Sequence, residues 1–174
     1  MPRSVITAVV ARIGGGTLHN RTIGTNADAV SFDNAFLSSM WCAPIRLPDD
    51  LDPTYPANVY ADLAPDIDNA TSGYSAILQV NATICPENGP WLDHDAELAL
   101  SIPNPWSILD TLRVTFDDGS GVTFPAGILT AGAVLGLRLK RLPADARDNY
   151  PRIMPALACL TLDYHRRCQR IGVC

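Results

Sequence analysis

Two segments of the chain alternate between apolar and polar side chains with a period of two residues. Residues 75–84 carry small or aliphatic side chains at every second position, namely Ala76, Leu78, Val80, Ala82 and Ile84. Residues 134–141 place Leu135, Leu137 and Leu139 on one side, and Arg138 and Lys140 on the other. Successive side chains of a β-strand point to opposite faces. Each segment is therefore predicted to be an antiparallel strand with one face in the core and the other in water or at an interface.

Short β-favouring runs, bounded by turn residues, make up most of the remaining chain. The 14 prolines and 12 glycines are spread along it, so few stretches keep a helical period for three turns. The expected strands are residues 5–10, 40–47, 58–61, 74–85, 96–102, 111–116, 121–124, 134–141 and 157–164. Met40 and Trp41, on the second of them, are expected in the core. This pattern predicts an all-β fold, an antiparallel β-sandwich of the jelly-roll type.

Residues 113–124 are predicted to form a β-hairpin. Asp118 and Gly119 at its centre have the Asp-Gly chemistry that supplies a positive φ in tight turns. A calcium loop is the alternative for residues 117–121. The spacing and the closing glutamate of an EF-hand are missing, so a plain turn is favoured.

The first 30 residues are expected to differ from the rest of the chain. Residues 11–30 are rich in Gly, Thr, Asn and Ala, show weak periodicity and contain the run Gly14, Gly15 and Gly16. Such a segment becomes ordered only against another surface. We therefore expect residues 1–30 to form an extended N-terminal arm with the first strand, and residues 31–174 to form the sandwich domain.

Charge is distributed unevenly along the chain. The net charge of −5 at pH 7 argues against direct binding of nucleic acid. Basic residues gather in the last fifth of the chain, whereas acidic residues gather between positions 49 and 68. The two regions are interpreted either as surfaces of opposite sign that meet partners, or as ordinary solvated faces.

Metal-binding and targeting signals are not recognisable in the sequence. The five cysteines, Cys42, Cys85, Cys159, Cys168 and Cys174, lack the C-x-x-C spacing of zinc and redox sites, and the three histidines are far apart. No metal or cofactor is expected. Because no apolar stretch suits a signal peptide or a bilayer span, we expect synthesis in the cytoplasm, reduced thiols and no membrane partner.

The densest group of candidate catalytic residues is Asp93, Asp95 and Glu97, which follow Trp91. On a strand these carboxylates would share one face, an arrangement that suits a glycosidase. The turn-rich residues 86–90 precede them, so a solvated loop is favoured. Cys159 and Cys168 flank basic residues that can lower a thiol pKa, but no base partner is recognisable. The chain is therefore predicted not to be an enzyme and to have no catalytic residues.

Three segments together resemble a known class of viral proteins. They are an apolar strand that leads into a Leu-Pro-acidic turn (residues 40–53), a small-residue turn that opens a long strand (70–76), and the strand at 129–141, followed by a loop at 145–150 and a last strand. In this order they resemble the β-sandwich structural proteins of tailed bacteriophages, especially trimeric decoration (cement) proteins of capsids and related fibre or tailspike head motifs. The resemblance spans roughly residues 30–165, and the basic residues 164–170 depart from it.

This resemblance implies a viral structural protein without enzymatic activity. It would be a homotrimer on the outer capsid surface of the virion, bound to the major capsid protein and stabilising the shell through multivalent contacts. The charged contacts would come from Arg138, Arg141, Arg166, Arg167 and Arg170. The arm around Gly14, Gly15, Gly16 and Asn26 would reach a neighbouring subunit.

The alternative function is a carbohydrate-binding or fibre (tail) attachment β-sandwich. Such a module needs aromatic side chains that are open to solvent, and the candidates are Trp91, Trp106 and Tyr74. The low aromatic content of 7% does not favour this alternative over the capsid protein.

Overall fold

The structure, a computed structural model, describes residues 2–14, 20–23, 27–65, 67–107, 110–157 and 159–167. These residues form strands and turns, with no helix. The strands are β1 (Arg3–Gly14), β2 (Asn20–Ile23), β3 (Ala27–Phe32), β4 (Ser38–Cys42), β5 (Ile45–Arg46), β6 (Asn58–Leu63), β7 (Ser75–Cys85), β8 (Leu92–Ser101), β9 (Leu112–Thr115), β10 (Val134–Arg141), β11 (Met154–Leu157) and β12 (Cys159–His165). No helix able to span a bilayer is present in the part of the chain that the structure describes.

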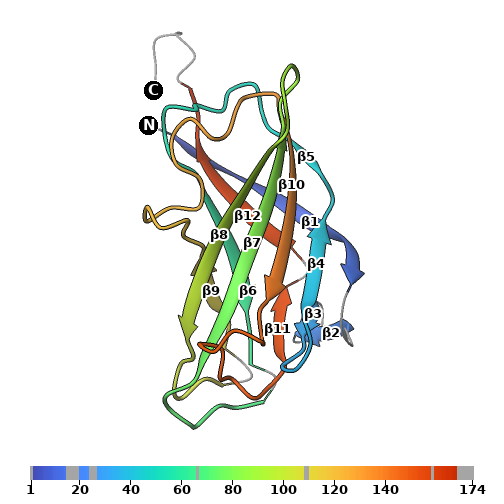
Figure 1. Cartoon of the computed structure of the whole chain (residues 1–174), viewed down its shortest axis with the longest axis vertical. Coiled ribbons are helices and arrows are strands. Elements are labelled where there is room, and N and C mark those ends of the chain that lie inside the picture. Colours follow the sequence, from blue (N-terminus) through green and yellow to red (C-terminus); the bar gives the residue numbers. More distant parts are fainter. Residues whose placement is uncertain are drawn as a thin grey trace.

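The strands build two antiparallel layers. The first sheet has the order β2-β3-β11-β6-β12-β1, with β9 on β6, and the second has the order β1-β4-β10-β7-β8, with β5 on β10. Figure 1 shows β8, β7 and β10 running side by side, with β1 and β12 crossing behind them. The all-β antiparallel sandwich of the jelly-roll type is thereby confirmed.

Strand β1 belongs to both sheets. Its residues from Arg3 to Val9 pair with β12, whereas those from Val10 to Gly14 pair with β4. The register shifts between Val10 and Arg12, which is an irregularity of the β-bulge kind. Bulges bend a strand and increase its twist, so this shift lets one strand pass from one layer to the other.

The inner faces of the two sheets share one apolar core. It includes Phe32, Met40, Leu78, Leu139 and Leu162, each of which is fully buried. The alternation predicted for β7 and β10 is confirmed, because Leu78, Val80, Leu137 and Leu139 point inward. The outward side chains of the same strands are therefore held on a rigid, continuously paired sheet.

The N-terminal segment is not an arm in its described part. β1 pairs with β12 over Arg3 to Val9 and with β4 over Val10 to Gly14, β2 pairs with β3, and β3 pairs with β11. Ala29, Val30 and Phe32 of β3 are buried in the core. The expectation of an arm was wrong because a composition rich in small residues does not prevent a segment from completing a sheet whose other strands lie far away in sequence.

Two local predictions also differ from the structure. Residues 92–97 belong to β8 and pair with β7, whereas a solvated loop was expected. Residues 113–124 do not form a hairpin, because β9 pairs with β6, and the isolated bridges of Asp117 and Phe124 are made to Glu97 and Ala57. Asp117 instead accepts hydrogen bonds from the backbone of Gly119 and Gly121 and holds a plain loop, which agrees with the interpretation as a turn.

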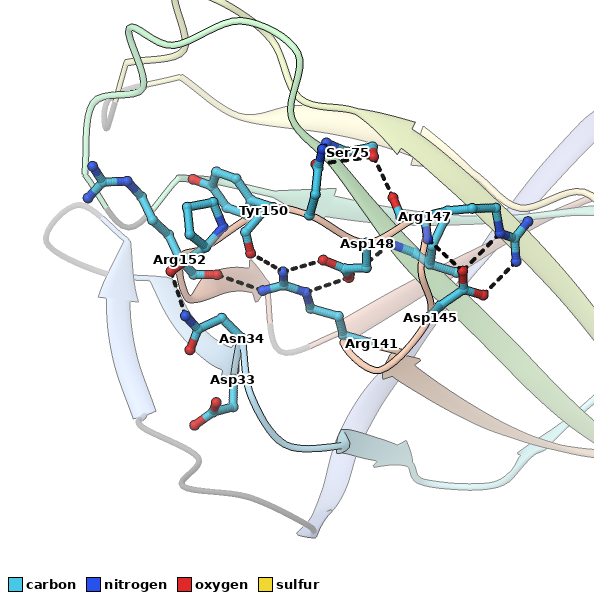
Figure 2. A network of polar contacts seen from close by, with 12 residues as sticks. Asp33, Asn34, Ser75, Arg141, Asp145, Arg147, Asp148, Tyr150 and Arg152 are labelled. Atoms are coloured by element: carbon cyan, nitrogen blue, oxygen red, sulfur yellow. Dashed lines mark hydrogen bonds and ion pairs between the residues drawn. The ribbon is translucent and has the colours of Figure 1, made fainter.

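Arg141 at the end of β10 forms a buried polar network with the loop that follows (Figure 2). Its side chain is fully buried and donates from Nε and Nη2 to the carboxylate of Asp148, at 2.9 and 2.7 Å. The same guanidinium donates to the backbone carbonyls of Tyr150 and Arg152. Asp148 also accepts a hydrogen bond from the amide of Ile77 on β7. The loop is thus tied to two strands of the second sheet.

The interface role expected for Arg141 is a wrong prediction. A side chain with no exposed surface cannot contact a partner, and all the hydrogen bonds described for this guanidinium stay within the chain. Buried charges persist only when they are paired and hydrogen-bonded. Arg141 is therefore a structural residue that organises the loop after β10.

Candidate functional site

Four outward side chains form a row across the second sheet. In the register of the strands, Trp41 of β4 lies opposite Arg138 of β10, Arg138 opposite Asn81 of β7, and Asn81 opposite Asp95 of β8. Directly opposed residues of antiparallel strands are close neighbours on one face. One aromatic, one cationic, one amide and one carboxylate side chain are therefore lined up on the outer face.

This row forms the floor of an open groove of about 570 Å³. The groove is lined by Trp41, Cys42, Pro44, Asn81, Ala82, Thr83, Asp93, Asp95, Gly136, Leu137, Arg138 and Lys140. Its polar side chains come from the outward positions of β7, β8 and β10. The predicted core position of Trp41 was wrong, because the side chain is only partly buried and turns to the groove, whereas Met40 is buried as expected.

Trp41 is held between cationic side chains. The guanidinium carbon of Arg138 lies 4.4 Å from the centre of the indole ring, and that of Arg12 lies 5.1 Å from it. Both distances are within the range of cation–π attraction. Arg138 also donates from Nη2 to the hydroxyl of Ser39 at 2.8 Å. These contacts fix the indole and the guanidinium against each other at one side of the groove.

The absence of a side chain at Gly14 of β1 leaves space for the indole of Trp41. We expect Gly14→Ala to displace Trp41, because a Cβ at residue 14 would lie 2.7 Å from Cζ3 of the ring. The near-ultraviolet circular dichroism of the tryptophans should change while the fold is retained. Gly136→Ala, in the same groove, is the matched control, since its Cβ would approach no atom closer than 3.8 Å. Identical spectra for both variants would contradict this role of Gly14.

The opposite side of the groove is acidic. Asp95 accepts a hydrogen bond from Nδ2 of Asn81, and Asp93 accepts one from the hydroxyl of Thr83 at 2.7 Å. Both aspartates are exposed. Asp93, Asp95 and Glu97 thus share one face of β8, as expected if they lay on a strand, and the loop that was favoured for them is not formed. The carboxylates of Asp95 and Asp93 are held by the amide of Asn81 and the hydroxyl of Thr83 on β7.

An ion-pair network lies beside Glu97, at one end of the acidic face of β8. Glu97 of β8 pairs with Arg147 at 2.8 Å, and Arg147 also pairs with Asp145 at 2.7 Å. The hydrogen bonds from Arg147 lower the pKa of Asp145 to about 2. Arg147 lies on the loop that Arg141 anchors, so the buried network indirectly places a charged group beside β8.

The other residues predicted to make interface contacts lie elsewhere. Arg166 pairs with Asp50 at 2.5 Å, and Arg167 is exposed at the end of the described chain. Gly15, Gly16, Asn26 and Arg170 lie outside the described residues. Of the predicted residues that the structure describes, only Arg138 lines the groove, and Gly14 supports it from β1.

The three aromatic residues predicted as sugar platforms differ in exposure. Trp91, directly before β8, is 78% exposed, whereas Trp106 is 3% exposed and belongs to the core. Tyr74 is half-buried and packs edge-on against Tyr150, with ring centres 5.9 Å apart. Strand alternation assigns Trp91 to the same side as Asp93 and Asp95. Trp41, which lies in the groove itself, was missed as a candidate.

Two of the described cysteines, Cys42 and Cys159, are poor nucleophiles. Burial raises the pKa of the Cys42 thiol to about 12 and also raises the pKa of Cys159, so both are protonated at neutral pH. The lowering of the Cys159 pKa considered from the sequence is therefore wrong. Cys168 lies outside the described residues. Among the residues that the structure describes, no group of three or more His, Cys, Asp and Glu side chains is placed to hold a metal ion.

Comparison with known proteins gives structural matches of low similarity. No family model and no curated protein matches the chain. Among solved structures, the family 11 carbohydrate-binding module from Clostridium thermocellum in complex with a β-1,3-1,4-mixed-linked tetrasaccharide has a TM-score of 0.40 at 10% identity, covering 91% of this chain and 87% of that one. TmCBM61 in complex with β-1,4-galactotriose has a TM-score of 0.38 at 10% identity, covering 95% and 89%. Similarity at this level does not assign a function.

The expectations drawn from the resemblance to capsid decoration proteins stay predictions. They comprise the homotrimer, the major capsid protein as partner, and the location on the virion. What the residues themselves display is a groove with aromatic, donor and acceptor groups on one rigid sheet.

Proposed function

We propose that the protein is a non-catalytic carbohydrate-binding module that holds a glycan chain in the groove of the second sheet. The observation that carries the proposal is the cross-strand row of Trp41, Arg138, Asn81 and Asp95 on the floor of one open groove. We therefore prefer the carbohydrate-binding alternative to the capsid protein. It rests on Trp41, which the sequence analysis did not name as a sugar platform.

The chemistry of the row suits a sugar ring. A pyranose presents C–H groups on its faces and hydroxyl groups around its edge. The part of the Trp41 indole that Arg12 and Arg138 leave exposed offers an apolar aromatic surface for the C–H groups. Arg138 donates hydrogen bonds, while the carboxylates of Asp93 and Asp95 accept them from hydroxyl groups. Hydrogen bonds to charged groups are stronger than those between neutral ones, so a few of them can orient a polyhydroxylated ligand.

The shape of the site supports the same ligand. A volume of about 570 Å³ lies within the usual range of roughly 300–1,000 Å³ for small-molecule sites. Because the floor consists of four continuously paired strands, its side chains are already ordered before binding. A preorganised site loses less conformational entropy when the ligand binds.

Two polar atoms beneath the groove have unfilled hydrogen-bonding capacity. Asn81 Oδ1 and Arg138 Nε are both buried and have no partner in the structure. Buried polar atoms without partners are rare in folded proteins. Neither atom is exposed to solvent in this structure, so a ligand hydroxyl or a bridging water completes their hydrogen bonding only when the side chains around them move. The two residues lie opposite each other in the register, at the middle of the row.

Affinity electrophoresis against a panel of soluble polysaccharides tests the proposal. We expect at least one polysaccharide to retard the wild-type protein, and Trp41→Ala to weaken this retardation at least tenfold, the loss typical of a binding hot spot. Tyr60→Ala, on the outer face of the first sheet, is the control and should bind like the wild type. If no polysaccharide retards the protein, or if the Trp41 variant binds normally, the proposal fails.

A further inference from the structure

The cations of the groove lack carboxylate partners, although carboxylates lie on the same face. Five arginines elsewhere in the described chain are paired with acids, namely Arg3, Arg113, Arg141, Arg147 and Arg166. Among the described residues, neither Arg138 nor Lys140 forms an ion pair, and no hydrogen bond is described for the ammonium group of Lys140. The side of the groove next to β4 therefore carries positive charge that the protein itself does not neutralise.

The architecture of the sheet keeps these charges apart. β7 lies between β10, which carries the cations, and β8, which carries the acids. Asn81 and Thr83 of β7 engage the carboxylates of Asp95 and Asp93. The acids are thereby satisfied without reaching Arg138. The groove has a cationic side next to Trp41 and a hydrogen-bond-accepting side along β8.

We infer that the glycan bound in this groove is acidic, with a uronate carboxylate on Arg138 and Lys140 and hydroxyl groups on Asp93 and Asp95. This inference rests on the proposed function. A uronate unit carries both kinds of group on one ring, at separate positions, as the two sides of the groove require. Nη2 of Arg138 donates to Ser39, and no hydrogen bond is described for Nη1. The outer end of the guanidinium is thus left for a carboxylate, whose two oxygens an arginine fork matches. Lys140 adds a second charge two residues further along the same face.

The negative net charge of the chain restricts the attraction of acidic glycans to the groove. With a net charge of −5, the protein as a whole repels polyanions. Attraction must then come from the groove, where close charge-assisted hydrogen bonds outweigh the weaker long-range repulsion. Arg12, which also lies beside Trp41, forms no ion pair among the described residues and adds to this local positive charge.

Matched ligand pairs test the inference. Polygalacturonate, alginate and hyaluronate are compared by affinity electrophoresis with the same polymers after methyl esterification of their carboxyl groups. We expect at least one uronate polymer to bind tenfold or more tightly than its neutral ester. Lys140→Gln should remove about tenfold of that difference, as expected for the loss of a charge-assisted contact, and should weaken the binding of the ester less than that of the uronate. Arg113→Gln, which removes the same charge from the first sheet, should have no effect.

The outcomes separate the two proposals. If neutral polymers and esters bind as tightly as uronates, and Trp41→Ala but not Lys140→Gln weakens binding, the proposed function stands and the inference is wrong. If dextran sulfate gains more over dextran than uronates gain over their esters, the carboxylate is not the recognised group, and the inference again fails. If no glycan binds, both proposals fail together.

Discussion

Asp148→Ala is expected to lower the free energy of unfolding by about 3–5 kcal/mol, the loss typical of breaking a buried ion pair. The variant leaves the guanidinium of Arg141 buried with only the carbonyls of Tyr150 and Arg152 as partners. It also leaves the amide of Ile77 without the carboxylate that it contacts. An uncompensated charge in the interior is far more costly than the pair, because neither water nor an opposite charge reaches it.

Urea denaturation of the purified chain measures this loss. Asp145→Ala is the matched control in the same loop, since Asp145 also pairs with an arginine, Arg147, but on the surface, and its removal should change stability little. The double variant Arg141→Met/Asp148→Leu should lose less than Asp148→Ala, because it removes both charges together. Equal midpoints for Asp145→Ala and Asp148→Ala would show that the pair does not hold the loop.

Phe32→Ala is expected to cost about 3–5 kcal/mol, the usual range for truncating a buried phenylalanine. The side chain has no exposed surface and joins the core from β3, which pairs with β11. A loss of this size would show that β3 is part of the core of the folded chain. The variant thus tests a strand that the sequence-based expectation missed.

Phe36→Ala, four residues further along, provides the control. Phe36 is 63% exposed, and a surface substitution of this kind usually changes stability by less than about 0.5 kcal/mol. Thermal or urea unfolding of both variants gives the comparison. Similar stabilities for the two variants would place residue 32 outside the core.

The fold class could be predicted because it depends on local alternation. The periods of β7 and β10 were visible in the sequence, and they identified the leucines that point inward as well as Arg138 and Lys140 that point outward. The same alternation also indicates that Arg141 points inward. Residue 141 is in phase with Leu137 and Leu139, so its inward direction follows from the alternation, although its charge suggested a surface position.

The groove could not be predicted in the same way. Trp41, Asn81 and Arg138 become neighbours only through the register between strands that lie dozens of residues apart. A shift of one residue in that register would turn one strand's side chains to the other face. A single sequence does not specify such long-range pairing. Trp41 was therefore assigned to the core, and the short strands β2, β3 and β11 were missed.

The passage of β1 through both layers ties the binding face to the opposite sheet. A strand that is hydrogen-bonded to β12 at one end and to β4 at the other cannot detach from one layer without disturbing the second. The two halves of the sandwich are thus expected to open as one cooperative unit. By thermodynamic linkage, a ligand that occupies the groove would protect the distant first sheet as well, since it favours only the fully assembled state.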